Sequence, residues 1–164
     1  MIPVPRSSVS NSDASAVDAD VSFNVEPLAV VHHTDHFLHL AISGPYGAEE
    51  SAGFIETLAE FVEEGRLPTL ALIDYRRTTS WTVPVAVGMR HAQWFMGLDF
   101  PKNFAAAVLS PHRRSGILLN SVAKLVASHF QATHHTSVPS AMGYLQSKAE
   151  ALGLPPPPPV FDDV

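Results

Sequence analysis

PTLALIDYRRTTSW, residues 68–81, places a short apolar run directly in front of an acid, two arginines and three hydroxyl side chains. Pro68 precedes the run and Asp74 ends it. A run bounded in this way is typical of a central parallel strand that helices cover on both faces. In open α/β sheets, ligands and partners bind where such strands end. The pattern therefore predicts a buried strand at residues 70–73, followed by a functional loop.

The composition indicates one acidic globular domain. A chain of 164 residues with 46% hydrophobic content has enough material for one compact core. The formal net charge is -6, from 16 acidic residues against 10 Lys and Arg, which disfavours binding to the phosphate backbone of nucleic acids. The absence of cysteine excludes disulfides, thiol catalysis and Cys-ligated zinc. Because of the negative net charge, we expect no nucleic-acid partner.

No segment of the sequence has the pattern of a membrane signal. The N-terminus has no apolar core of roughly 7–15 residues, and no uncharged apolar run approaches the ~18 residues that span a bilayer. We expect a cytoplasmic protein, with a peripheral position at the membrane as the alternative.

Composition divides the chain into three parts. Residues 1–22 are mostly small, polar and acidic without periodicity, which predicts a disordered arm. Residues 23–153 carry the periodic segments of the folded domain. Residues 154–164 contain five consecutive prolines, which predict a polyproline II tail outside the core. We expect the tail to act as a spacer, and capture by an aromatic groove of a partner is the alternative.

The periodic segments alternate between strands and helices. A hairpin at residues 23–33 and 36–43 ends at Gly44 and Pro45, and a short polar strand at 132–137 is expected at the sheet edge. The other predicted segments are helix 48–64, strand 70–73, helix 84–97, strand 104–110, helix 115–130 and helix 138–152. The order β-β-α-β-α-β-α-β-α predicts an α/β fold with a mixed, mostly parallel sheet of about five strands and about four helices.

Four short motifs occur along this order: ISG at Ile42–Gly44, LIDYR at Leu72–Arg76, FPKNFAAAV at Phe100–Val108 and SAMGYL at Ser140–Leu145. With them the chain resembles the SpoIIAA-like branch of STAS domains, which are named for sulfate transporters and anti-sigma factor antagonists. The resemblance extends over most of the chain, from about Val25 to Leu152. It implies a STAS-like mixed sheet with an N-terminal hairpin.

The same resemblance implies a non-enzymatic regulatory and signalling module that binds a protein partner. Antagonists of the wider fold bind a kinase and are switched off by phosphorylation of a Ser in an Asp-x-Ser motif after the third strand. Here Tyr75 and Arg76 follow Asp74, so the acceptor motif is missing. Three nearby hydroxyls are candidate phosphorylation sites or, alternatively, ordinary loop and N-cap groups: Thr78, Thr79 and Ser80.

Cationic side chains gather in two predicted loops. Four of the 10 Lys and Arg residues follow two neighbouring parallel strands, and the N-termini of the next two helices point to the same edge. We therefore expect an anion or an acidic segment of a protein partner to bind at the carboxyl edge of the sheet. Pairing with the Glu-rich first helix, or simple solvation, is the alternative. The residues of this predicted edge site are Asp74, Arg76, Arg77, Ser80, His112, Arg113 and Arg114.

Helix 84–97 supports a second hypothesis, in which the protein binds lipid or a membrane surface. The helix is mostly uncharged, and it could form a movable flap over an apolar pocket, with an arginine to meet lipid headgroups. Packing of its Trp under a neighbouring loop is the alternative. The predicted buried side consists of Val85, Met89, Ala92 and Met96. The predicted lipid surface consists of Val87, Arg90, His91, Trp94 and Phe95.

Other chemistry lacks a supporting motif. The adjacent histidines at 32–33 and at 134–135 fall on opposite faces of their strands, so a shared metal site is disfavoured. The sequence contains neither HExxH nor GxSxG, and it has no glycine-rich nucleotide loop. We predict no enzyme activity, no metal and no cofactor. The identity of the partner stays open, as does the formation of homo-oligomers.

Overall fold

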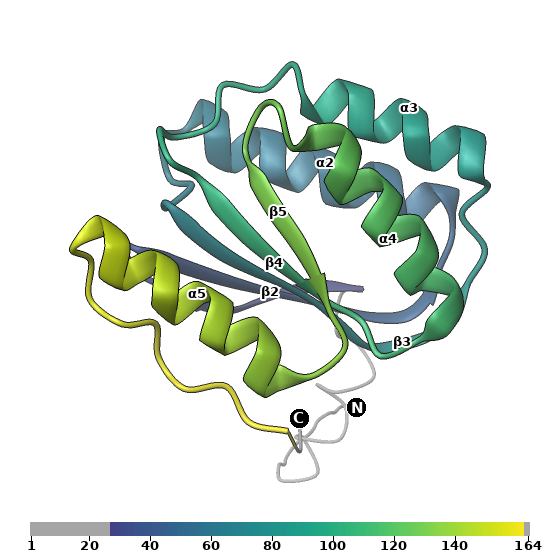
Figure 1. Ribbon diagram of the computed structural model, residues 1–164. Helices are drawn as coiled ribbons and strands as arrows, with labels where there is room; N and C mark the ends of the chain where they lie inside the picture. The colour runs from purple at the N-terminus through teal and green to yellow at the C-terminus, as the bar shows by residue number, and fades with distance from the viewer. Residues whose placement is uncertain (1–26, 163–164) are drawn as a thin grey trace, which may run out of the picture.

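The computed structural model describes residues 27–162, so the predicted arm at 1–22 and the predicted start of the first strand lie outside the described residues. Figure 1 shows a sheet between two layers of helices. The element order matches the predicted one. The strands are β1 (Leu28–His33), β2 (Phe37–Tyr46), β3 (Leu70–Trp81), β4 (Ala105–Leu109) and β5 (Gln131–His135). The helices are α2 (Ala48–Glu63), α3 (Val85–Phe95), α4 (Arg113–Val126) and α5 (Val138–Leu152).

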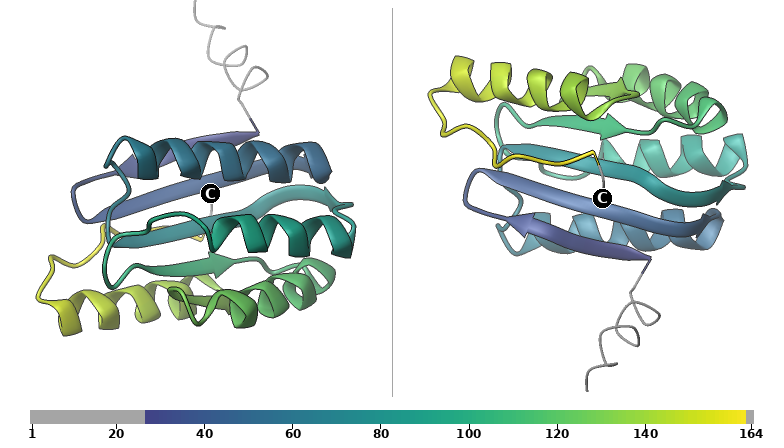
Figure 2. Two further views of the ribbon diagram at one scale, coloured as in Figure 1. Left: turned by 90° about the horizontal axis from the view of Figure 1, so that it is seen from above. Right: turned by 90° about the horizontal axis from the view of Figure 1, so that it is seen from below.

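The strands lie in sequence order, β1-β2-β3-β4-β5, which determines where the helices go. β1 is antiparallel to β2, and the other neighbours are parallel. Right-handed crossovers that always step in one direction place their helices on one side of a sheet. α2, α3 and α4 accordingly share one side, here called the three-helix face, and α5 covers the other, here called the tail face (Figures 1 and 2). The predicted α/β fold with a mixed sheet is confirmed, and β5 lies at an edge as predicted.

β2 and β3 are longer than the sequence predicts. Gly44 and Pro45 do not end β2, which continues to Tyr46, and the predicted loop after Asp74 belongs to β3. The two extensions pair with each other through register shifts at Ala41/Ser43 and Gly44/Pro45. A proline is tolerated in a strand at such an irregularity. The prediction of a polar loop is therefore wrong, because β2 supplies the backbone partners that keep this polar segment extended.

α3 presents a different side to the core from the one predicted. Of the predicted buried set only Ala92 is buried, while Val85 is 67% exposed. Val87 and Phe95 instead pack against the core. The helix lies between α2 and α4, so its contact stripe is set by two neighbours as well as by the sheet. A helix with apolar residues all around cannot be oriented from its own periodicity.

The C-terminal segment departs most from prediction. α5 ends at Gly153, which adopts a left-handed conformation with φ of 69°. Residues 154–162, here called the tail, then run back beneath the sheet instead of leaving it (Figure 2). Pro157 is buried, and Leu154 and Val160 pack against the core of the tail face. The prediction that the tail lies outside the core is thus wrong, because the tail packs on the sheet beside α5, which contacts β3, β4 and β5.

Candidate functional site

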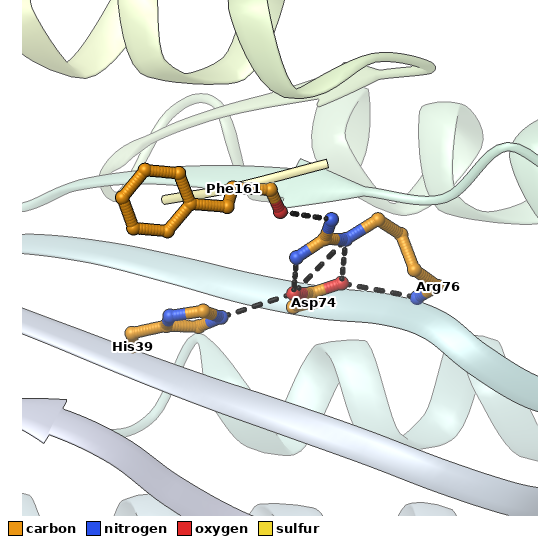
Figure 3. Close-up of polar contacts among 4 residues, drawn as sticks. All are labelled: His39, Asp74, Arg76 and Phe161. Carbon is orange, nitrogen blue, oxygen red and sulfur yellow. Dashed lines mark hydrogen bonds and ion pairs between the residues drawn. The ribbon is translucent and has the colours of Figure 1, made fainter. Parts of the chain in front are cut away.

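A buried ionic cluster lies on the tail face, where β2 and β3 run side by side. Asp74 of β3 and His39 of β2 are 2% and 3% exposed. His39 Nε2 lies 3.0 Å from Asp74 Oδ2, and Arg76 Nη2 lies 2.7 Å from the same oxygen (Figure 3). Arg76 Nε and the Arg76 backbone N–H both donate to Asp74 Oδ1, at 2.9 and 3.0 Å. One carboxylate therefore holds an imidazole and a guanidinium in fixed orientations.

The contacts of Asp74 determine its charge. Burial alone would raise the pKa of this carboxyl, but the hydrogen bonds from His39 and Arg76 outweigh burial and hold the pKa well below its ordinary value. Asp74 is therefore a carboxylate at neutral pH. Buried charges of this kind are tolerated only when they are paired and hydrogen-bonded. In the cluster formed by His39, Asp74 and Arg76, Asp74 is the shared partner, so its removal takes this contact from both of the other residues.

The tail covers this cluster. Arg76 Nη1 donates to the backbone carbonyl of Phe161 at 2.7 Å, which joins residues 85 positions apart in sequence. In Figure 3 the Phe161 backbone lies directly against the Arg76 guanidinium, while its ring points away from that group. The Phe161 side chain is 64% exposed. The tail is thus anchored to the cluster through its backbone and not through this aromatic ring.

The structure divides the predicted edge site into separate parts. Asp74 and Arg76 bind each other on the tail face, so they do not form part of an open anion site. Ser80 lies six residues further along β3, about 20 Å from Asp74 at the rise of an extended strand. Arg113 and Arg114 belong to the first turn of α4 and not to a loop. The predicted members that are exposed are Arg77, Ser80, His112 and Arg113.

The three candidate phosphorylation sites differ in access. Thr78 is buried, and its hydroxyl donates to the Tyr75 carbonyl at 2.7 Å. Thr79 and Ser80 are exposed on the extension of β3. All three lie in a strand, so the predicted loop and N-cap roles do not apply. Thr78 would have to leave the sheet before a kinase could reach its hydroxyl.

The three-helix face contains a cavity of about 110 Å³ between the sheet and its helices. Its walls are mostly apolar, and polar groups gather in one part of it. Tyr75 Oη donates to Tyr46 Oη at 3.3 Å, and a hydrogen bond of 2.8 Å joins Ser51 Oγ and His91 Nδ1. Burial raises the pKa of both tyrosines, and burial together with Arg90 lowers that of His91. These groups are therefore uncharged at neutral pH.

The predicted lipid surface on α3 is also divided. Trp94 is 51% exposed, and Arg90 is exposed as well. His91 and Phe95 line the cavity, and Val87 packs against the core. The five residues therefore do not all face outward, and the flap over an apolar pocket stays a prediction. Only Arg90 and Trp94 of the set are available to a membrane surface in this conformation.

The histidine pairs lie as strand alternation predicts. His33 packs edge-on against Phe61 of α2, while the ring of the adjacent His32 lies 6.4 Å from that of Phe37, on the tail face. Within the described residues, no three His, Asp or Glu side chains converge on a metal position. Every helix between residues 27 and 162 falls short of the length and apolar character that a bilayer-crossing segment needs.

Sequence reasoning missed the pairing of His39 with Asp74. His39 interrupts the apolar run in HFLHLAI and Asp74 ends the run in LALID, and the two runs belong to neighbouring buried strands. A polar side chain within a buried strand needs a hydrogen-bonding partner, and the nearest buried strand is the first place to look for one. The signal was therefore present, although the register that brings the two side chains together is not written in either run.

Comparison with solved structures finds a likeness to the phosphorylated form of SpoIIAA, the Bacillus cell fate determinant. The match has 11% sequence identity and a TM-score of 0.42, and it covers 71% of this chain and 97% of that chain. No protein-family model matches the sequence, and no curated protein does. The fold assignment rests on strand order and register, and not on this likeness.

Proposed function

We propose that this chain is a non-enzymatic, regulatory binding module that engages an acidic segment of a protein partner at the carboxyl edge of its sheet. The observation that supports this function is a group of exposed cationic side chains near the ends of β3 and β4. Arg77 and Arg113 are exposed, and neither forms an ion pair with any residue from 27 to 162. An acidic partner would supply the missing counter-charges.

Exposed apolar side chains at the same end of the molecule favour a protein partner over a small anion. Val85 in the first turn of α3 and Ile117 in the second turn of α4 are each 67% exposed. Both helices begin at the carboxyl edge, so these side chains lie at the same end of the molecule as Arg113. An apolar centre with charged residues around it is the usual composition of a protein interface.

Arg76 is excluded from this surface because it is bound to Asp74 and to the tail. A charge reversal at this position would place two carboxylates together in a buried site and would test stability instead of binding. The substitutions that test the edge surface are therefore Arg77→Glu and Arg113→Glu. Lys124→Glu, an exposed reversal in the last turn of α4, is the matched control.

Affinity capture from a lysate of the native host, followed by quantitative mass spectrometry, tests the proposal. We expect proteins that the parent and Lys124→Glu retain to be depleted at least about tenfold by the Arg77→Glu/Arg113→Glu variant, since each lost charge pair weakens binding. An unchanged set of captured proteins would remove the edge surface as the binding site.

The cavity supports lipid binding as the second candidate function. The cavity is mostly apolar and lies under α3. Trp94 of the same helix is exposed. Outward movement of α3 would join the cavity to a membrane surface. Co-sedimentation with phosphatidylcholine/phosphatidylglycerol vesicles at low salt tests this function. We expect the parent to sediment and Trp94→Ala to do so several-fold less, and a parent that stays in the supernatant contradicts the idea.

A further inference from the structure

The tail contacts the sheet with a period of three residues. Leu154 and Val160 are partly buried against the core of the tail face, and Pro157 between them is buried. Pro158 is also partly buried, whereas Pro155, Pro156, Pro159 and Phe161 are exposed. A polyproline II helix has three residues per turn, so positions i, i+3 and i+6 share one side of it. The tail therefore presents one regular stripe to the protein, as a peptide ligand of this conformation does in a groove.

The tail is held without pairing as a strand. Residues 155–159 are prolines and have no N–H to donate to β2 or β3. The polar anchor is the hydrogen bond of 2.7 Å from Arg76 to the Phe161 carbonyl. A backbone carbonyl is present at every residue of every chain, and the stripe needs only two apolar residues that flank a proline at the correct spacing. Nothing in these contacts depends on attachment to α5.

α5 alone does not cover the tail face, and the tail occupies the strip of sheet beside it, here called the groove (Figure 2). α5 contacts β3, β4 and β5, and Figure 2, seen from below, shows the tail crossing the sheet beside α5 and over the boundary between β2 and β3. The core against which Leu154 and Val160 pack includes Phe37 and Leu70, and the buried ionic cluster lies on the same face. Asp74 and His39 fix the Arg76 guanidinium in the orientation that meets the carbonyl. The recognition group is thus held in place by the fold itself.

We propose that this groove is a binding surface for a proline-rich segment of a partner protein, of the pattern apolar-x-x-Pro-x-x-apolar, and that the tail is an intramolecular occupant which the partner displaces. The segment enters in the extended polyproline II conformation, and Arg76 donates to one of its carbonyls. The surface lies on the tail face and is independent of the edge surface described above. The exposed Phe161 ring contributes little to the contact.

Attachment makes the tail a strong competitor. A segment tethered directly to Gly153 has an effective concentration on the order of 1 mM. If the tail segment binds the groove with a dissociation constant of about 100 μM, a free peptide would bind the occupied groove about tenfold more weakly than the vacant one. The partner needs either a tighter segment or a second contact elsewhere. This arithmetic gives the proposal a measurable consequence in the whole chain.

The test uses a fluorescein-labelled peptide with the sequence of residues 154–162, LPPPPPVFD, and the full-length protein. Val160→Asp in the protein places a charge in the apolar stripe and releases the tail while leaving the groove unchanged. We expect fluorescence anisotropy to show the peptide binding this variant about tenfold or more tightly than the parent. Phe161→Ala in the protein keeps the carbonyl anchor, so it should bind the peptide as weakly as the parent does.

Two controls separate the groove from nonspecific binding. A peptide carrying aspartate in place of its valine should not bind the Val160→Asp protein. If circular dichroism shows that Val160→Asp is not folded, the full-length Pro157→Ser variant replaces it, because that change opens the centre of the stripe without adding charge. Failure of the parent-sequence peptide to bind the folded, tail-released variant overturns the proposal. Equal binding by parent and variant overturns it too.

Discussion

The two faces of the sheet are closed by different means. The three-helix face has α2, α3 and α4 over it and an aromatic core in which Phe54, Tyr75 and Phe104 take part. The tail face has α5, a proline-rich tail and the ionic cluster around Asp74. The difference follows from strand order, because one-directional right-handed crossovers send three helices to one side and leave the other to whatever follows β5.

The two faces should differ in how strongly a substitution changes the stability of the fold. Apolar burial on the three-helix face is non-directional, and it tolerates a cavity. The tail face depends on the carboxylate of Asp74, whose contacts are directional, and on the tail, which we propose a partner segment can displace. Substitutions on the tail face should therefore have larger and more specific effects than matched substitutions beneath the three helices. The predictions that follow test this difference between the faces.

The largest effect is expected at Asp74. Asp74→Asn removes the charge that pairs with Arg76 and with His39, and breaking a buried ion pair on one side typically costs about 3–5 kcal/mol. Urea denaturation should show this loss as a lower midpoint with an unchanged slope. Asp99→Asn, on the exposed segment after α3, is the control and should change stability by less than about 0.5 kcal/mol. A loss below about 1 kcal/mol at Asp74 would mean that the cluster contributes little.

Acid should weaken the same cluster gradually. The pKa of Asp74 is depressed in the folded protein, whereas an unfolded Asp titrates near about 3.9. The stabilisation by its carboxylate is therefore fully present above about pH 4 and is lost as the pH falls toward the folded-state pKa. In that range this one group makes stability fall by up to about 1.4 kcal/mol per pH unit.

The comparison with Asp74→Asn isolates this effect from the other carboxylates. Denaturation midpoints measured from pH 7 to pH 3 should fall more steeply in the parent than in the variant, so that the difference between them narrows in acid. Parallel curves would show that Asp74 has the same pKa in both states.

The elements themselves were largely predictable, and their lengths and contacts were not. α5 occupies the predicted range, since Gly153 and the apolar spacing mark its end clearly. Gly44–Pro45 and the polar run after Asp74 ordinarily mark the end of a strand. β2 and β3 continue past them because the added residues of each strand pair with those of the other. The lack of an N–H on proline correctly predicts that the tail does not pair as a strand. It does not predict whether Pro157 packs against the core. The contact between His39 and Asp74 depends on register, which no single strand contains.

Packing density gives a third test of the two faces. Ala123 of α4 borders the cavity, whereas Ala141 of α5 is fully buried under the sheet with other core residues around it. Ala→Val has the same helix-propensity cost at both sites, so the difference between the two variants reports on space alone. Ala141→Val should be less stable than Ala123→Val by about 1–3 kcal/mol in urea denaturation, because overpacking strains a filled core. Equal losses would indicate that the cavity cannot accept two methyl groups.

The smallest expected effect concerns the turn that directs the tail into its groove. Gly153 has φ of 69°, a conformation in which an L side chain costs about 1–2 kcal/mol, and Gly153→Ala should lower stability by about that amount. Gly143 lies in the middle of α5, is exposed, and has no atom within 4 Å of an added Cβ. Gly143→Ala should therefore raise stability by about 0.5–1 kcal/mol, because alanine favours a helix interior. Glycine-to-alanine substitutions ten residues apart are therefore expected to change the free energy of unfolding in opposite directions. Denaturation midpoints measure this difference. A neutral or stabilising Gly153→Ala would mean that the chain leaves α5 by another route and that the tail does not depend on this turn.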